Sequence, residues 1–262
     1  MPPSWGDFTF TVDHWRIEQE KIVGLLGAQT ALALDYLRRL EGSSNPNVIR
    51  DAPNADDIED FEGTGLDPVG DVTFINDQFV NLLPQTVEGI DFGVDWSNRT
   101  QWGRFNFSLN ATKMLEYSRE PGPVVDELVA AREAGIINPL TVLPISSQLI
   151  AVDGRPEWRV MSNVNWSGGP WRIGLTAHYT SEVEQPDLLS ADAEPWVVDE
   201  QLTFNLYGQY EFGDMGLASG TQVRLGVRDL FDEGPPLAEG GYLGSLHRPY
   251  GRYWYASVSK TF

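Results

Sequence analysis

Six stretches of the chain alternate apolar and polar residues with a period of two, and this pattern limits the possible folds more than any other feature. In the stretch 103–117, Phe105, Phe107 and Leu109 fall on one face, whereas Asn106 and Ser108 fall on the other. Successive side chains of a β-strand point to opposite faces of a sheet, so each stretch predicts a strand with one apolar face. The chain is therefore predicted to be all-β. The stretches are 90–96, 103–117, 158–166, 171–179, 202–212 and 221–230.

The alternation alone does not tell which face of the strands meets water. A soluble β-sandwich buries its apolar face, whereas a membrane β-barrel turns that face to lipid and keeps a wet lumen. Two features favour the barrel: the polar faces hold hardly any lysine, and aromatic residues occur near both ends of the apolar faces. Trp158 and Trp166 are eight positions apart, which at ~3.3 Å per residue and a ~40° tilt gives about 20 Å of depth, close to the apolar band between aromatic girdles. The residues predicted to form the girdle are Trp96, Trp158, Trp166, Trp171, Tyr179 and Trp254.

Short and long connections alternate between the predicted strands. The short ones are 98–102, 167–170 and 213–220, and the long ones are 118–155, 181–196 and 231–249. In outer-membrane barrels, short turns face the periplasm and long loops face the outside of the cell. The sequence thus predicts an antiparallel transmembrane β-barrel segment with long outer loops.

About eight strands are expected in this segment. The first covers residues 8–18, where a change of phase predicts a bulge near Asp13 and His14. Residues 72–96 are interpreted as one long strand with a bulge or kink at Pro84, and an extra hairpin is the alternative at that place.

Two of the long loops are expected to hold short helices. Residues 21–40 carry apolar side chains at helical spacing, and 124–134 is a second candidate. Residues 51–71 are strongly acidic, but they lack the ordered ligand spacing of a calcium-binding loop. We therefore expect a solvated loop there and no metal site.

Composition and motifs exclude several function classes. The 262-residue chain has 38 acidic and 18 basic residues, a formal net charge of −20, so nucleic acid is not expected as a partner. The absence of cysteine rules out a disulfide scaffold and a cysteine–zinc site. His14, His178 and His247 are far apart in sequence and no catalytic motif accompanies them, so neither an enzyme nor a cofactor is predicted. The start, "MPPSWGDFTF", lacks a signal-peptide pattern, and no stretch is apolar enough for a membrane helix.

Four segments, in this order along the chain, resemble the C-terminal barrel of TonB-dependent receptors, the ligand-gated transporters of the Gram-negative outer membrane. "FTFTVDHWRIE" is similar to the strand before a long outer loop, in which "NVIRD" lies, and "NLLPQTVEGIDFGVDW" is similar to a later strand. "VRDLFDEGPP" resembles the family's Asn-Leu-Phe-Asp-x-x-Pro-Pro element, with Asp229 where Asn is usual. "GRYWYASVSKTF" resembles the last strand with its terminal Phe. The resemblance extends along nearly all 262 residues.

This resemblance implies both a fold and a function. The family has a signal peptide, an energy-coupling box, a plug and about 22 strands. Residues 1–262 are therefore expected to be the C-terminal part of a larger receptor barrel, without plug or signal peptide. The implied function is TonB-dependent uptake of a scarce ligand, such as a siderophore, cobalamin or a glycan. The alternatives are a small, passive eight-stranded barrel and a soluble β-sandwich binding module.

The implied location is the Gram-negative cell outer membrane, and the implied partners are its lipid and the barrel-assembly machinery, which reads the last strand and Phe262. The TonB complex would be reached only through the plug, which this chain is expected to lack. Ligand contacts are expected from the lumen wall and the outer loops. The candidates are Arg172, His178, Arg224, Arg228, Tyr242 and Tyr250. The ligand itself cannot be read from the sequence, because this fold serves different ligands by varying its loops.

Overall fold

The computed structural model describes residues 5–20, 22–77, 79–81, 84–120, 122–141, 143, 148–192, 194–214 and 216–261. The chain divides into two compact units. The first comprises Met1–Ile17, Val87–Tyr117 and Leu149–Phe262, and the second comprises Glu18–Thr86 and Ser118–Gln148.

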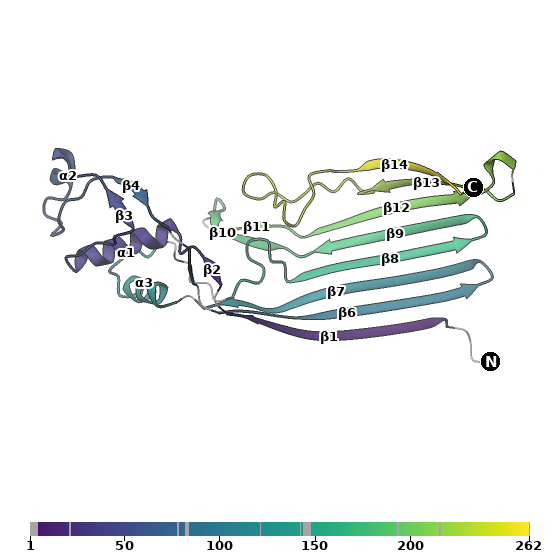
Figure 1. Cartoon of the computed structure of the whole chain (residues 1–262), viewed down its shortest axis with the longest axis horizontal. Helices are drawn as coiled ribbons and strands as arrows, with labels where there is room; N and C mark the ends of the chain where they lie inside the picture. The colour runs from purple at the N-terminus through teal and green to yellow at the C-terminus, as the bar shows by residue number, and fades with distance from the viewer. Residues whose placement is uncertain are drawn as a thin grey trace. The chain divides into compact units, whose positions relative to one another are not determined.

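The first unit is built on one eight-stranded sheet (Figure 1). The strands of this sheet lie side by side in the order in which they occur along the chain. The pairings from β7 to β14 are antiparallel, and β1 and β14 form the two edges. The predicted eight strands and the β class are therefore confirmed. In order across the sheet, the strands are β1 (Asp7–Gln19), β6 (Gln85–Thr100), β7 (Gly103–Arg119), β8 (Trp158–Gly168), β9 (Trp171–Thr180), β12 (Gln201–Glu211), β13 (Thr221–Arg228) and β14 (Tyr253–Lys260).

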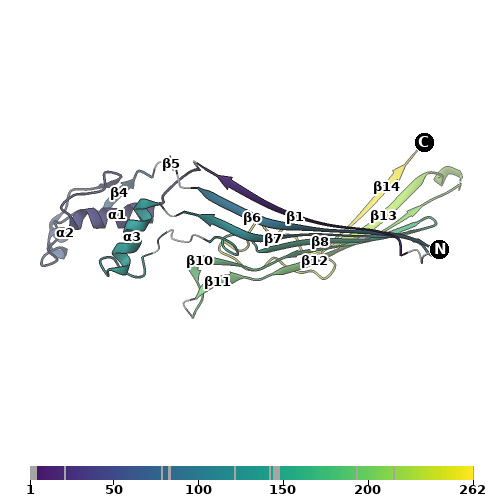
Figure 2. The ribbon, with the colours of Figure 1, turned by 90° about the horizontal axis from the view of Figure 1, so that it is seen from below.

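One face of the sheet is apolar and open to the surroundings. The exposed fractions of Trp254, Val258 and Leu225 are 74%, 70% and 60%. Figure 2 shows the sheet nearly edge-on as one curved layer. A sandwich would cover such a face with a second sheet, and within the described residues no second sheet of comparable size exists. The soluble β-sandwich is therefore wrong as a description of this fold.

The opposite face is polar and its side chains are linked across the strands. The side chain of Asn163 receives a hydrogen bond from Thr176 (2.8 Å) and donates one to Ser108 (3.3 Å). Tyr207 donates to the amide oxygen of Asn165 (3.1 Å). A Cβ atom at Gly174 would lie 2.2 Å from the ring of Tyr207, so this glycine makes room for the tyrosine.

Residues 72–96 do not form one strand, so that prediction is wrong. β4 (Val72–Ile75) pairs with β3 (Val48–Arg50), and β5 (Val80–Asn81) pairs with β2 (Val23–Gly24). Only from Gln85 onward does the chain join the large sheet, as β6. The chain therefore changes partners between β5, which ends at Asn81, and β6, which Pro84 directly precedes. Proline has no N–H donor and so does not suit the interior of a sheet.

The bulge predicted in the first strand is also wrong. A Cβ at Gly93 would lie 2.4 Å from Oγ1 of Thr11, and one at Gly89 would lie 2.5 Å from the indole of Trp15. Thr11 and Trp15 are four residues apart on one strand, and their partners Gly93 and Gly89 are four residues apart on the other. No extra residue is therefore inserted between the two pairs. Trp15 therefore stays on the face of Thr11, where Gly89 leaves space for its ring.

The second unit holds helices and small sheets. α1 (Ala28–Leu40) and α3 (Pro123–Glu133) confirm the two predicted loop helices, and α2 (Ala55–Asp60) lies within the acidic stretch. The two guanidinium nitrogens of Arg38 donate to the carboxylate of Glu127 at 2.6 and 2.7 Å. This pairing holds the pKa of Glu127 below its usual value. The apolar core of the unit consists of Ala33, Leu37, Leu128, Ala131, Ile137 and Leu143.

Two absences hold for the described part of the chain. It contains no group of three or more His, Cys, Asp or Glu side chains arranged to hold a metal ion. None of its helices has the length and apolarity needed to cross a membrane.

Candidate functional site

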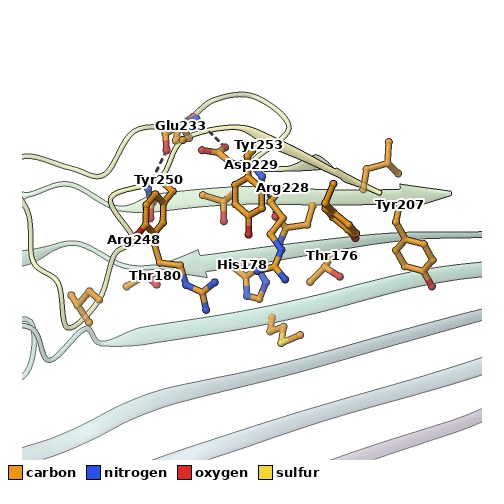
Figure 3. Close-up of a pocket in the computed structure, with 18 residues that line it drawn as sticks. Thr176, His178, Thr180, Tyr207, Arg228, Asp229, Glu233, Arg248, Tyr250 and Tyr253 are labelled. Carbon is orange, nitrogen blue, oxygen red and sulfur yellow. Dashed lines mark hydrogen bonds between the residues drawn. The ribbon is translucent and has the colours of Figure 1, made fainter. Parts of the chain in front are cut away.

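A cavity of about 550 Å³ opens on the polar face of the sheet, over β9, β12, β13 and β14 (Figure 3). Strand register brings its walls together: His178 lies opposite Thr203 on β12 and opposite Met161 on β8. Arg228, the last residue of β13, lies opposite Tyr253, the first residue of β14. The strands thus supply a floor of hydroxyl, imidazole, guanidinium and phenol groups.

Arg228 and Arg248 are the cations of this cavity. Arg228 is exposed, and its guanidinium carbon lies 5.7 Å from the ring centroid of Tyr253. Arg248 comes from the connection between β13 and β14, and Figure 3 shows both arginines on the side of the cavity where His178 lies. Tyr250 adds a second ring from the same connection and is 73% exposed.

The connection 229–252 is attached to the sheet at its start. Asp229 is 7% exposed and has a φ of +51°, a left-handed conformation that Asp and Asn adopt more readily than other residues. Its N–H donates to Asn205 (3.0 Å), and its carboxylate accepts from the N–H of Glu233 (2.9 Å). The Asp in place of the usual Asn therefore still suits the backbone at this point.

Gln201 attaches the same connection at two further points. Its amide nitrogen donates to the carbonyls of Glu233 (3.4 Å) and Gly234 (3.2 Å). Its amide oxygen lies 2.9 Å from Nδ1 of His247, which is 4% exposed. Burial, and secondly the charge of Arg159, lower the pKa of His247, so its ring is neutral near pH 7. The contact at His247 fixes the position of Arg248, the next residue.

The hairpin of β10 (Val183–Leu189) and β11 (Pro195–Val198) supports the connection from outside the sheet. Gln185 accepts a hydrogen bond from the N–H of Glu239 (2.8 Å), and the indole of Trp196 donates to the carbonyl of Leu237 (2.9 Å). The connection therefore has polar attachments near both its ends and its middle. These attachments hold Arg248 and Tyr250 at the cavity.

The chemistry of the cavity suits an anionic or aromatic ligand rich in oxygen. Guanidinium groups bind carboxylate-like and phenolate-like oxygens through paired N–H donors, and they also stack on rings. Tyrosine rings offer a face for stacking and a hydroxyl for hydrogen bonding. The two acids of the cavity, Asp229 and Glu233, lie at one side, and the carboxylate of Asp229 already accepts from the backbone.

The structure brings together three of the six predicted ligand contacts: His178, Arg228 and Tyr250 line the cavity. Arg172 lies at the other end of β9 and pairs with Glu211 at 3.3 Å. Arg224 donates to Gln209 and lies 4.3 Å over the ring of Tyr207, so it contacts a lining residue without lining the cavity. Tyr242 does not line it either.

Sequence reasoning missed Arg248, Tyr207 and Tyr253 as lining residues. The alternation did carry a signal for Tyr253. This residue falls on the polar face of its strand, whereas the next residue, Trp254, falls on the apolar face. Arg248 had no periodic signal, since it lies in an irregular connection whose position depends on Gln201 and His247.

The expected aromatic residues lie near the ends of the strands. Trp158 stacks with Phe92 (6.3 Å between centroids), and the ammonium of Lys113 lies 5.2 Å from its ring. At the turn end, Trp171 packs edge-on against Tyr210 at 4.7 Å. Phe262, the expected assembly signal, lies outside the described residues.

No family model and no curated protein sequence matches this chain. Solved structures do match in fold. The siderophore receptor PirA from Acinetobacter baumannii is 12% identical, with a TM-score of 0.55 over 97% of this chain. A mutant of the ferric enterobactin receptor PfeA from Pseudomonas aeruginosa is 13% identical, with a TM-score of 0.51 over 97% of this chain.

The chain spans only 29% of the PfeA structure and 30% of the PirA structure. Its open sheet with β1 and β14 at the edges agrees with this partial coverage. The predicted resemblance to the barrel of TonB-dependent receptors is therefore confirmed at the level of the fold. The chain has the fold of one section of a receptor β-barrel.

Proposed function

We propose that this chain forms part of the barrel wall of a TonB-dependent receptor in the Gram-negative outer membrane. One observation carries the proposal: a single sheet, with the fold of siderophore receptors, has an exposed apolar face and a polar face with an arginine and tyrosine cavity. The apolar face suits contact with lipid, and the polar face suits a wet lumen. The activity is uptake of a scarce ligand and not catalysis.

The cavity supports an anionic ligand, with a ferric siderophore as the preferred class. Arg228 and Arg248 would bind its oxygens, and Tyr250 and Tyr253 would contact its rings or apolar parts. The named ligands of the structural neighbours are siderophores, ferric enterobactin among them. Cobalamin and glycans offer fewer anionic oxygens to two guanidinium groups, so they are the less favoured ligands.

The proposed partners follow from the two faces and the last strand. Outer-membrane lipid would meet the apolar face, and the assembly machinery would recognise β14 and Phe262. Energy coupling through the TonB complex would need a plug. A passive eight-stranded barrel would require β1 to pair with β14, whereas these strands lie at opposite edges of the described sheet.

The test is uptake by the native host with the gene deleted and then restored. Iron-limited cells are given radiolabelled ferric enterobactin, other ferric siderophores, cobalamin or oligosaccharides. Restoring the gene should restore uptake of one ferric siderophore. Arg228→Gln with Arg248→Gln should reduce its binding at least ~10-fold, because two charge-assisted contacts are lost.

Arg172→Gln is the matched control. Arg172 is an exposed arginine near the start of β9, and it does not line the cavity. Immunoblots of the outer-membrane fraction show that each variant is present in equal amount. The proposal fails if deletion changes the uptake of no ligand, and the cavity assignment fails if the control weakens binding as much as the double variant.

A further inference from the structure

The small sheet of β3 and β4 in the second unit has one exposed apolar face (Figure 1). Val48 is buried, whereas the next residue, Ile49, points to the other side of the strand and is 47% exposed. Phe74 lies directly opposite Ile49 and is 57% exposed. These two side chains therefore project to the same face of the sheet and are together called the Ile49–Phe74 pair.

The acidic stretch 51–71 begins and ends at this sheet. Asp51 follows β3 and Asp71 precedes β4, and the N–H of Asp51 donates to the carbonyl of Asp71 (3.0 Å). Asp51 comes two positions after Ile49, which is about 7 Å along a strand. Asp71 comes three positions before Phe74, which is about 10 Å. Both aspartates are exposed, so carboxylates flank the Ile49–Phe74 pair.

The carboxylates of the acidic stretch make no ion pair among the residues that the structure describes. The stretch holds eight acidic residues and no lysine, arginine or histidine. Arg38 and Arg50 pair with acids elsewhere in the second unit. Arg39 approaches the stretch, but its guanidinium donates to the backbone carbonyl of Asp67. The negative charge of the stretch is therefore left to attract a cation from outside the unit.

The charge of the whole second unit limits which partner can cover this face. Residues 18–86 and 118–148 include 17 acidic and six basic residues. A second copy of the chain would bring the same acids to the contact, and anionic lipid or nucleic acid would be repelled in the same way. A cationic polypeptide is attracted by the carboxylates, and one of its apolar side chains can cover the Ile49–Phe74 pair. Charge complementarity therefore indicates one kind of occupant.

We propose that the exposed face of the β3–β4 sheet is a docking surface for a cationic polypeptide segment that carries an apolar side chain. The apolar side chain would pack on the Ile49–Phe74 pair. Lysines or arginines two or three positions away along an extended segment would reach Asp51 and Asp71. This surface belongs to the second unit, whereas the strands that form the ligand cavity belong to the first. The inference therefore does not depend on the ligand or on uptake.

The test uses the full-length protein in micelles of an uncharged detergent and a fluorescent synthetic peptide of alternating lysine and valine. Fluorescence anisotropy should show binding of this peptide. Ile49→Ser with Phe74→Ser should weaken the binding ~10-fold, because the apolar contact is lost. Ile136→Ser with Leu140→Ser is the matched control, since both residues are exposed in the same unit, and it should change the affinity less than ~2-fold.

Charge reversal separates docking from misfolding and from unspecific attraction. Asp51→Lys with Asp71→Lys should abolish binding of the lysine–valine peptide and create binding of a glutamate–valine peptide, a gain that misfolding cannot produce. Asp126→Lys with Glu133→Lys makes the same change of charge at exposed positions of α3. This second reversal should alter the affinity for the lysine–valine peptide less than ~2-fold at physiological salt.

Several outcomes would overturn the proposal. It fails if the lysine–valine peptide does not bind, if the two charge reversals weaken binding equally, or if Ile49→Ser with Phe74→Ser leaves the affinity unchanged. It also fails if light scattering shows a dimer that the Ile49→Ser and Phe74→Ser changes dissociate, because the face would then belong to a second copy. Displacement of the peptide by anionic lipid vesicles that bind the protein would assign the face to lipid instead.

Discussion

Nδ1 of His247 lies 2.9 Å from Oε1 of Gln201, so a buried histidine attaches the connection 229–252 to the first residue of β12. The amide oxygen accepts only, so Nδ1 must carry the proton and donate it. Nε2 is then unprotonated, and it has no hydrogen-bond partner among the described atoms. A second proton at Nε2 would put a charge into this buried position, where the cation of Arg159 acts on it.

This arrangement predicts that acidification loosens the connection. Burial lowers the pKa of His247 below the usual 6.5, so the released state, with its higher pKa, takes up the proton first as the pH falls. The stabilising contribution of neutral His247 is complete above pH 6.5, declines below it, and is lost once the pH passes the folded-state pKa. The protection factors of the amides in 231–252, which are corrected for the intrinsic pH dependence of exchange, should therefore be smaller at pH 5.5 than at pH 7.5.

His247→Asn is the variant that checks this assignment. Asparagine can still donate to Gln201 but does not titrate, so exchange in 231–252 should then depend on pH only through its intrinsic chemistry. His178→Asn, a change at the other histidine of this region, should leave the pH dependence in place. An unchanged pH response of the His247 variant would contradict the prediction.

Gly174 predicts a steric effect on the cavity. Its missing Cβ would lie 2.2 Å from the ring of Tyr207 and 2.6 Å from the side chain of Asn165. Gly174→Ala should therefore displace the tyrosine and lower the free energy of unfolding by about 1–3 kcal/mol. Gly208→Ala is the control, because a Cβ there meets no atom within 4 Å. Urea unfolding in detergent measures both, and equal values would contradict the role of Gly174.

Leu225 predicts how the apolar face behaves. It is 60% exposed, lies opposite Gly208 and Ala256, and faces away from the cavity. If this face meets lipid, Leu225→Arg should make folding into bilayers less favourable by about 2–4 kcal/mol. Asn106→Arg, on the polar face, should cost much less. Refolding into vesicles, followed by gel mobility, measures both; similar costs for the two would count against contact with lipid.

The alternation of apolar and polar residues predicted the strands of the large sheet, because each of these strands has one apolar and one polar face along its whole length. Alternation could not show where residues 72–96 change partners. Val72 and Phe74 have the same period as Ile90 and Phe92, yet they pair with β3, which precedes them by more than 20 positions. The partner of an extended segment is decided by tertiary contacts, which a single period does not encode.

The candidate site was predictable only where it lies on regular strands. His178 and Arg228 follow from parity, since each falls on the polar face of its strand. Arg248 follows from no local pattern, because its position depends on a contact between His247 and Gln201, 46 residues apart. The side of Trp15 was likewise decided across the sheet, by the space that Gly89 leaves.

Leu128 predicts that the second unit has a stable core of its own. It is 0% exposed and belongs to the cluster that includes Leu37 of α1 and Ala131 of α3. Leu128→Ala removes buried methyl groups and leaves a cavity, so it should cost about 2–5 kcal/mol in the stability of this unit. Leu140→Ala is the control, because Leu140 is 85% exposed. Limited proteolysis within 28–41 and 122–134 should accelerate only in the Leu128 variant, and equal cleavage of the two would show that these helices do not share a cooperative core.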